Sequence, residues 1–462
     1  MENNRQLQLG TEGIRKLLLR FAVPSIIAMT ATSLYNMVDS IFIGQRCGEF
    51  AISGLAVTFP LMNLSGAFGA MVGIGASTLV SVKMGQRDHK AAESVVGNAV
   101  IMNVVIGILF MVVALAFLDP ILIFFGASSN TLPDARAYMQ TLLYGNVITH
   151  LYLGLNDIVR ATGYPQRAMA FTLSAVVSNI FFDYLFIYVF EMGIRGAAVG
   201  TLCAQAIAFG CEMVHFNSRN TYLRFSRRIF HFKGKVARGI MGIGLSPFLV
   251  NCCACFIVIL INKGLTSYGD DYYVGAYGIS NRIIFFFVMI VMGINQGMQP
   301  IVGYNYGARQ YDRSLKTFKV AAAAAVIVMS VCFVACHFFP AQIAALFTPY
   351  DNIIDITQHA LKIMTATAPL IGFQILSVGL FTALGMVSKS IFMSLTRQLI
   401  FLIPLLVILP RFWGTDGIWY SLPISDTLSC ITAVVLLSQV FRKLSSAAPT
   451  EKSSDERQNI NN

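Results

Sequence analysis

The sequence predicts an all-α integral membrane protein with twelve transmembrane helices in two six-helix lobes, related by a pseudo-twofold axis along the membrane normal. The first observation is composition: 56% of the 462 residues are hydrophobic and only 12% are charged, whereas an ordinary soluble domain carries about 25% charged residues. The second is a series of continuous apolar segments, which are unlike the alternating strands of a membrane barrel. The third is an internal repeat.

Each apolar segment contains about 20 residues or more, enough for a helix to cross a hydrocarbon layer about 30 Å thick. The residues before the first segment lack the short apolar core and cleavage site of a secretory signal, so we expect an uncleaved anchor. The predicted spans are 17–44, 51–80, 94–118, 136–160, 168–190, 196–217, 239–262, 274–304, 316–339, 358–384, 390–410 and 417–441.

These spans divide the chain into five parts. We expect a cytoplasmic N-terminal segment (1–16), an N-lobe (17–217), a basic cytoplasmic linker (218–238), a C-lobe (239–442) and a tail (443–462). The tail is rich in Ser, Asn and charge and has almost no apolar content, so we expect it to be disordered in the cytoplasm.

The net charge of +11 reflects membrane topology. Most Lys and Arg fall on one side of the predicted membrane, and basic loops stay in the cytoplasm. We therefore expect a multi-pass protein of the cell inner (cytoplasmic) membrane with both termini cytoplasmic, and no nucleic-acid partner. The opposite side holds only Arg46, Arg136, Arg195, Lys263 and Arg411.

The two halves align when the sequence is shifted by 221 to 223 positions. Pro24 then falls on Pro247, and Gly85 falls on Gly307. Because each half has an even number of spans, both halves start on the same side, and their axis runs along the membrane normal. Such pairs commonly enclose a cavity. The two prolines interrupt the first span of each half, which favours a kink there.

Two carboxylates lie deep in predicted spans of the first half. An ionised carboxylate at the bilayer centre costs about 2.5–3.5 kcal/mol on insertion scales, so it indicates a function. Asp39 shares a helical face with Tyr35 and Asn36. Asp183 lies one turn after Asn179 and faces the same way.

Several motifs resemble the multidrug and toxic compound extrusion (MATE) family. They are LYNMVDSIFIG (34–44), VGIGASTLVSVKMGQRDHKAA (72–92) and MGINQGMQPIVGYNYGARQYDRS (292–314). The resemblance implies two six-helix lobes that work by alternating access as a proton- or sodium-coupled antiporter. In the resembling bacterial and archaeal branch, the cation site maps onto Asp39, Asn179, Asp183 and Thr201 of this chain.

Either coupling ion suits this chemistry. Oxygen ligands without Cys or His suit Na⁺, while two carboxylates in a low-dielectric pocket also bind a proton. We expect no cofactor beyond that ion, and no metal other than Na⁺ at these four residues. In the repeat, Asp39 aligns approximately with Asn262, and Asp183 aligns approximately with Leu405. The second half therefore lacks the acidic pair, and we expect coupling to reside in the N-lobe.

The cavity between the lobes is expected to bind substrate. Met and aromatic side chains suit varied amphipathic ligands, and an acidic pocket favours organic cations. We predict multidrug efflux by a monomer that has membrane lipid as its only other partner. The candidate lining residues are Tyr35, Asn36, Phe286, Met289 and Met292.

The main alternative function is a lipid-linked saccharide flippase of the same superfamily. It would need several Arg or Lys at the central cavity, and only Arg282 and Arg397 are candidates in the spans. An enzyme would need a His, Cys or Ser constellation that the chain lacks, and a passive channel would not need the acidic pair.

Other polar residues within the spans have structural interpretations. We expect an Asp157–Arg160 ion pair, and pairing of Arg397 with Asp426. Glu212 and His215 are expected to snorkel to the cytoplasmic boundary.

Overall fold

The structure is a computed structural model of the whole chain. It describes residues 8–46, 51–218, 221, 223–225, 229–269, 271–347 and 350–447. Parts of the predicted N-terminal segment and basic linker, and the predicted tail from 448 onward, therefore lie outside the described residues. Among the described residues every regular element is a helix.

The first half forms one lobe, in which α8 continues directly into a turn of π-helix, η1. Its elements are α2 (Ile14–Arg46), α3 (Ala51–Gly85), α4 (His89–Ala116), α5 (Leu118–Phe124), α6 (Leu132–Tyr144), α7 (Asn146–Ala161), α8 (Pro165–Asp183), η1 (Tyr184–Val189) and α9 (Ile194–Asn217).

The second half forms the other lobe and also contains a π-helical segment, η3. Its elements are α10 (Gly234–Tyr268), α11 (Asp271–Gly307), α12 (Tyr311–Phe338), α13 (Pro340–Ala345), α14 (Asp351–Met364), α15 (Ala368–Ala383), α16 (Val387–Leu395), η3 (Thr396–Leu402), α17 (Ile403–Ile408) and α18 (Pro410–Ala447).

Two of the twelve predicted spans are divided by a break into two separate helices. Ten helices among the described residues are long and apolar enough to cross a membrane, and α14 with α15 makes an eleventh span that bends by 54°. The span predicted at 136–160 consists of α6 and α7, which have 13 and 16 residues. They meet at Gly145, where an added Cβ would collide with the side chain of Leu202.

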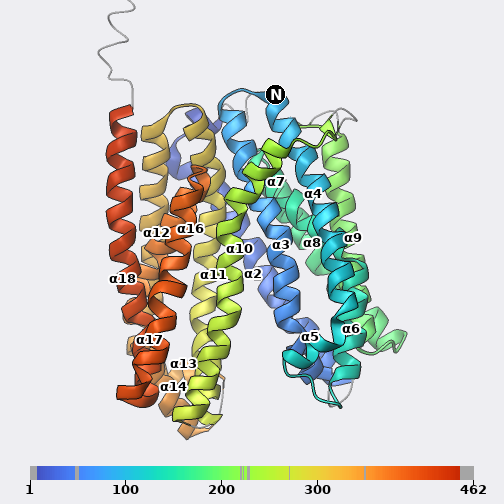
Figure 1. Cartoon of the computed structure of the whole chain (residues 1–462), viewed down its shortest axis with the longest axis vertical. Coiled ribbons are helices and arrows are strands. Elements are labelled where there is room, and N and C mark those ends of the chain that lie inside the picture. The colour runs from blue at the N-terminus through green and yellow to red at the C-terminus, as the bar shows by residue number, and fades with distance from the viewer. Residues whose placement is uncertain are drawn as a thin grey trace, which may run out of the picture.

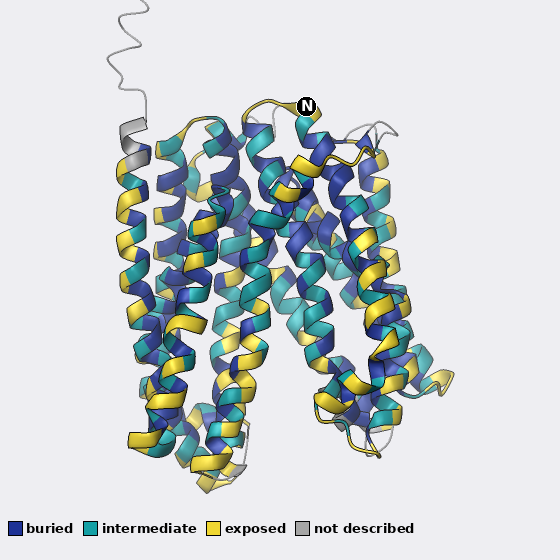
Figure 2. Cartoon of the chain, viewed as in Figure 1, coloured by how far each residue is buried: buried dark blue, intermediate teal, exposed yellow. Residues whose placement is uncertain are grey.

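The two lobes are joined at one end and separated at the other (Figure 1). The reason lies in the core. One large apolar cluster contains residues of both lobes, among them Phe21 and Val72 of the first and Ile294 and Phe381 of the second. Toward the opposite end each lobe has its own separate clusters, and Figure 2 shows more exposed residues there.

Close helix approach holds the joined end. Gly85 of α3 and Gly307 of α11, which the repeat aligns, each pack against the other helix. An added Cβ at Gly85 would collide with the carbonyl oxygen of Tyr304, and one at Gly307 would collide with that of Val82. Only glycine permits backbones to approach so closely.

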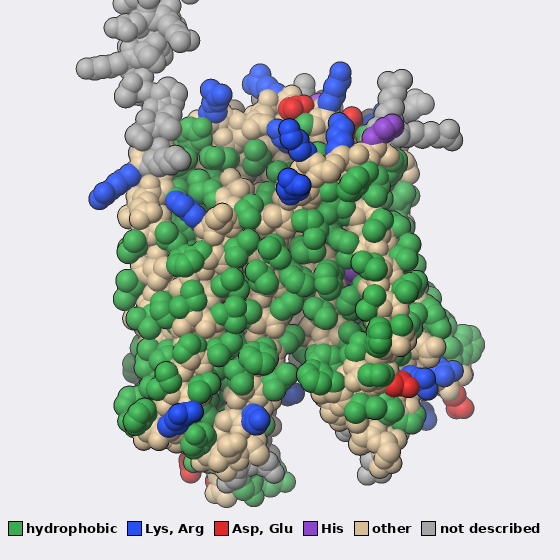
Figure 3. Space-filling model, viewed as in Figure 1, with side chains coloured by type: hydrophobic (Ala, Val, Ile, Leu, Met, Phe, Trp, Pro, Cys, Tyr) green, Lys and Arg blue, Asp and Glu red, His purple; other side chains and the backbone are tan. Residues whose placement is uncertain are grey.

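The charged residues divide the molecule in the way the sequence predicted. Figure 3 shows Lys and Arg gathered at the end that holds the N-terminus, with a wide apolar band below them. The hollow between the lobes opens at the opposite end. Pro24 and Pro247 lie inside α2 and α10, both of which continue across the proline.

Candidate ion and substrate sites

Three helices of the first lobe bring the four predicted ligands together. Asn179 of α8 donates from Nδ2 to Asp183 Oδ1 one turn later and to Thr201 Oγ1 of α9, both over 3.3 Å. Asp39 of α2 interacts with Asp183 through their side chains. All four residues are buried, and Asp183 is 0% exposed.

The cluster leaves oxygen atoms without a protein partner. Asp39 Oδ1, Asp183 Oδ2 and Asn179 Oδ1 are buried and accept no hydrogen bond from the described residues. Buried polar atoms are normally satisfied, so such orphans indicate a missing ligand. The donor set consists of hard oxygens, which suits Na⁺, and a shared proton would equally satisfy a carboxyl pair.

Local backbone features make room for Asp183. α8 ends at this residue and continues into the π-helical turn η1, a feature frequent at functional sites. Across from it, an added Cβ at Gly200 would collide with Asp183 Oδ1. The sequence interpretation missed Gly200, although it directly precedes Thr201 and its small size is the signal.

Two tyrosines belong to the surroundings of the carboxyl pair. Tyr35 of α2 and Tyr138 of α6 both lie within electrostatic range of Asp39 and Asp183. Tyr138 is 1% exposed. Tyr35 was predicted from its helical spacing, whereas Tyr138 was missed, because α6 precedes the break at Gly145 and its facing direction cannot be read from the sequence.

The corresponding region of the second lobe is an apolar core. Leu402 and Leu406, which flank Leu405, are buried together with Ile261 and Trp419. A cluster of this kind has no ligands for an ion. The acidic pair therefore has no counterpart in this cluster of the second lobe.

A cavity of about 450 Å³, lined by residues of the first lobe and by Gln296 of α11, lies beside the carboxyl pair. Tyr35, Asn179 and Thr201 line it, so two of the cluster's oxygen-bearing side chains border the cavity. The same cavity extends to Asn156 and Arg160. A hydrated ion or a small organic group could reach the cluster along this path.

A second cavity of about 190 Å³ lies between the lobes and receives side chains from both. Of the residues predicted for the substrate cavity, Met292 lines it. Phe286 and Met289 line neither this cavity nor that of the first lobe, and the Phe286 side chain is 55% exposed. The Asn36 side chain lies outside the described part of the structure.

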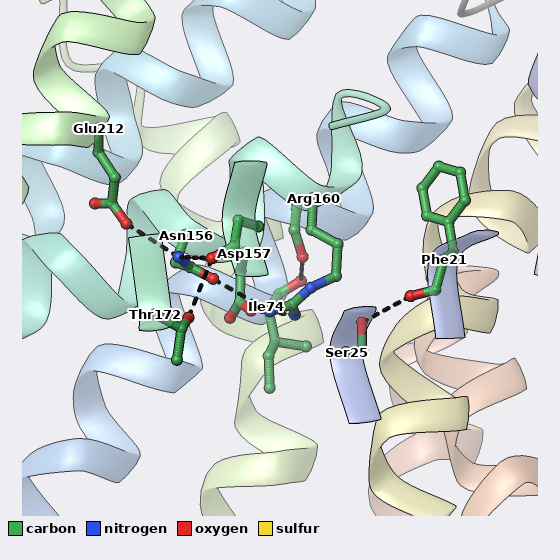
Figure 4. Close-up of polar contacts among 10 residues, drawn as sticks. Phe21, Ser25, Ile74, Asn156, Asp157, Arg160, Thr172 and Glu212 are labelled. Carbon is green, nitrogen blue, oxygen red and sulfur yellow. Dashed lines mark hydrogen bonds and ion pairs between the residues drawn. The ribbon is translucent and has the colours of Figure 1, made fainter. Parts of the chain in front are cut away.

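The two cavities meet at a buried polar network, shown in Figure 4. Arg160 donates to Asp157 Oδ1 over 3.0 Å and to Asn156 Oδ1 over 3.2 Å, and Asn156 donates to Glu212 Oε1 over 3.2 Å. The predicted Asp157–Arg160 ion pair is confirmed. Asp157 and Arg160 line both cavities.

The prediction that Glu212 and His215 reach the membrane boundary was wrong. Their exposed fractions are 0% and 4%. The physical reason is that α9 packs against α7 and α8, so that Glu212 meets Asn156 and His215 meets Arg167 at 2.9 Å. Each side chain therefore has a polar partner inside the protein and does not need to reach water at the membrane boundary.

The repeat and the family are established by comparison. The MatE family model matches residues 24–185 and 247–408. The two matches lie 223 positions apart, begin at Pro24 and Pro247, and confirm the internal duplication. The chain belongs to the MatE family. Its members are membrane transporters, so this chain is a transporter and not an enzyme.

Individual relatives agree with this assignment over nearly the whole chain. The multidrug export protein MepA of Staphylococcus haemolyticus is 26% identical over 444 residues, 96% of this chain and 98% of the relative. The solved structure of the MATE multidrug transporter DinF-BH is 36% identical, covers 93% of this chain and 96% of that one, and has a TM-score of 0.86.

A further similarity concerns the fold alone. The crystal structure of MATE in the bent conformation has a TM-score of 0.91 at 23% identity and covers 96% of this chain and 99% of that one. The twelve-helix arrangement in two six-helix lobes is therefore the arrangement of this family.

Proposed function

We propose that this MatE-family chain exports small amphipathic organic compounds, cations among them, in exchange for inward H⁺ or Na⁺. The observation that carries the proposal is the buried Asp39–Asp183 pair with its unpartnered oxygens. An ion or proton that binds there removes buried charge, and its release restores it. The two charge states then favour different arrangements of the lobes.

The direction of opening defines the side from which the coupling ion would enter. The hollow lies opposite the end where Lys and Arg gather, and the basic end of a membrane protein faces the cytoplasm. On this basis the conformation is open to the outside, both termini lie in the cytoplasm, and the protein resides in the cell inner (cytoplasmic) membrane. An ion from outside then reaches the pair through the cavity of the first lobe.

The energetics are adequate for efflux. One monovalent ion moving inward down 100 mV supplies about 2.3 kcal/mol, which corresponds to roughly 50-fold accumulation. We propose that α2 transmits the change. It carries Asp39, contains Pro24, and bears a Ser25 hydroxyl that donates to the Phe21 carbonyl over 3.0 Å (Figure 4). Such back-bonding beside a proline favours a bend.

The flippase alternative has less support. A pyrophosphate headgroup needs several cations, but only two guanidinium groups, those of Arg160 and Arg397, are among the residues that line the central cavity, and a carboxylate offsets the charge of each. Arg282, which the sequence offered as a candidate, does not line the cavity.

The test is efflux of a fluorescent organic cation from everted vesicles under separately imposed sodium and proton gradients. We expect transport to follow one gradient and to disappear in Asp39→Asn and Asp183→Asn. The matched control is Asp119→Asn, which removes a carboxylate that is 35% exposed and paired with Arg136 at 3.0 Å. Full gradient-driven transport by both site variants would refute the proposal.

A further inference from the structure

We propose that the central cavity contains a subsite for the carboxylate of a zwitterionic organic compound, with Arg397 as its anchor. The inference rests on the proposed export function and specifies one class of substrate for it. Three features of the cavity support the inference. They are the fixed orientation of the Arg397 guanidinium, the amide oxygens without partners, and the absence of the coupling carboxylates Asp39 and Asp183 from the cavity lining.

Arg397 lies in the π-helical segment η3 and lines the central cavity. Its Nε donates to Asp426 Oδ1 over 2.6 Å, and this is the one hydrogen bond of the guanidinium among the described residues. Asp426 is buried, with its side chain 3% exposed, whereas that of Arg397 is 27% exposed. Asp426 thus fixes the plane of the guanidinium and leaves its two terminal nitrogens free. A free edge of this kind suits a carboxylate.

Three amide side chains line the same cavity, and their oxygen atoms are enclosed by protein. Asn295 Oδ1, Gln374 Oε1 and Gln398 Oε1 have no hydrogen-bond partner among the described residues, and all three side chains line the cavity. Gln374 donates its amide nitrogen to Ser429, which fixes the oxygen as its free atom. Gln374 and Gln398 are 3% and 8% exposed. A ligand that turned these amides toward the cavity would offer its N–H groups to acceptors that have no other partner.

The charges favour a zwitterion over a simple cation or anion. The charged side chains lining the cavity are those of Asp157, Arg160 and Arg397, and Asp157 already binds Arg160. Among the described residues that line the cavity, no carboxylate therefore lacks a cationic partner. Asp426 offsets part of the charge of Arg397, so a compound with net negative charge would gain less than one that also carries cationic N–H donors.

The subsite is distinct from the coupling site. Asp39 and Asp183 do not line the central cavity, and Asn179 and Thr201 border the cavity of the first lobe. A substrate carboxylate at Arg397 would therefore not face the coupling carboxylates directly. Substrate and ion would be linked through the shared wall of the two cavities, to which Asp157 and Arg160 belong.

Two dyes that differ in one group test the inference. Rhodamine 110 has a free carboxylate and rhodamine 123 is its methyl ester, a cation. Binding of each dye to the purified full chain is measured by fluorescence polarisation, apart from any gradient. We expect the double variant Arg397→Gln/Asp426→Asn to weaken rhodamine 110 binding about tenfold or more, as for loss of a charge-assisted hydrogen bond, and to change rhodamine 123 binding less than twofold.

A matched variant separates recognition from packing. Asp426→Asn alone removes the same ion pair but keeps the guanidinium, so rhodamine 110 binding should be retained or strengthened. Arg397→Lys keeps the positive charge, so Asp426 stays paired, but it loses the planar edge of the guanidinium. We expect this variant to lose most of the difference in affinity between rhodamine 110 and rhodamine 123.

Three outcomes would overturn the inference: no binding of rhodamine 110 by the wild type, equal losses for both dyes in the double variant, or a loss in Asp426→Asn that matches the double variant. Export of rhodamine 123 from vesicles under an ion gradient tests the proposed function separately. If rhodamine 123 is exported and rhodamine 110 does not bind, only the carboxylate subsite is refuted.

Discussion

The Asn179 amide nitrogen lies 3.3 Å from Asp183 Oδ1, one helical turn away on α8. The same nitrogen lies 3.3 Å from Thr201 Oγ1 on α9. One amide therefore links the carboxylate to the neighbouring helix and leaves its own oxygen, Oδ1, without a partner among the described residues. The geometry makes Asn179 both a positioning group for Asp183 and a candidate ligand for the ion.

Thr201→Val tests the hydroxyl of this cluster. Valine keeps the shape of threonine but removes the oxygen that accepts from Asn179. We expect the apparent affinity for the driving ion to fall about fivefold to 100-fold, which corresponds to loss of one buried polar partner at about 1–3 kcal/mol. The measurement is initial efflux rate against ion concentration. Thr201→Ser should retain near wild-type values, and equal affinity in Val and Ser would contradict a role for the hydroxyl.

Gly200→Ala tests the space around Asp183. The added Cβ would collide with Asp183 Oδ1, so we expect gradient-driven transport to fall about tenfold or more while the protein still reaches the membrane. Gly210→Ala is the matched control, since it lies on the same helix and an added Cβ there has no atom within 4 Å. Equal transport by the two variants would show that the cluster tolerates displacement of Asp183.

Gly244→Ala tests the seal at the joined end of the lobes. An added Cβ would collide with the carbonyl oxygen of Met71 on α3, so the lobes could not close there. We expect a shift toward the state open at the basic end, observed as increased spin–spin distance between labels on α3 and α10. Gly242→Ala, whose nearest neighbour is Val387 Cγ2 at 3.4 Å, should leave that distance unchanged. Unaltered distances in Gly244→Ala would contradict the seal.

Leu402→Ala tests whether the second lobe has a packing core where the first has its ion cluster. Leu402 is buried with Leu406 and Trp419. Truncation of a buried leucine to alanine lowers the free energy of unfolding by about 2–5 kcal/mol. We expect a lower melting temperature in detergent with an unchanged ion dependence of transport. Leu399→Ala, at a 42% exposed site on the same segment, is the control. Altered ion dependence in Leu402→Ala would place part of the coupling in the second lobe.

Much of this arrangement could be predicted from the chain alone. Asp39 and Asp183 stood out because an acid in an apolar span is costly, and the repeat showed that the second half has no such pair. The partners of Gly200, Tyr138 and Glu212 could not be predicted, since helical spacing gives the face of a residue and not the helix that it meets.

The sequence by itself determined the spans, the duplication, the basic side and the acidic pair, because each depends on local composition and period. Only the tertiary structure decided that Arg160 and Arg397 share the central cavity, that Phe286 is exposed and that Glu212 is buried. The physical reason is that these outcomes depend on contacts between helices far apart in the chain, set by the close packing of small residues and by the end at which the lobes join.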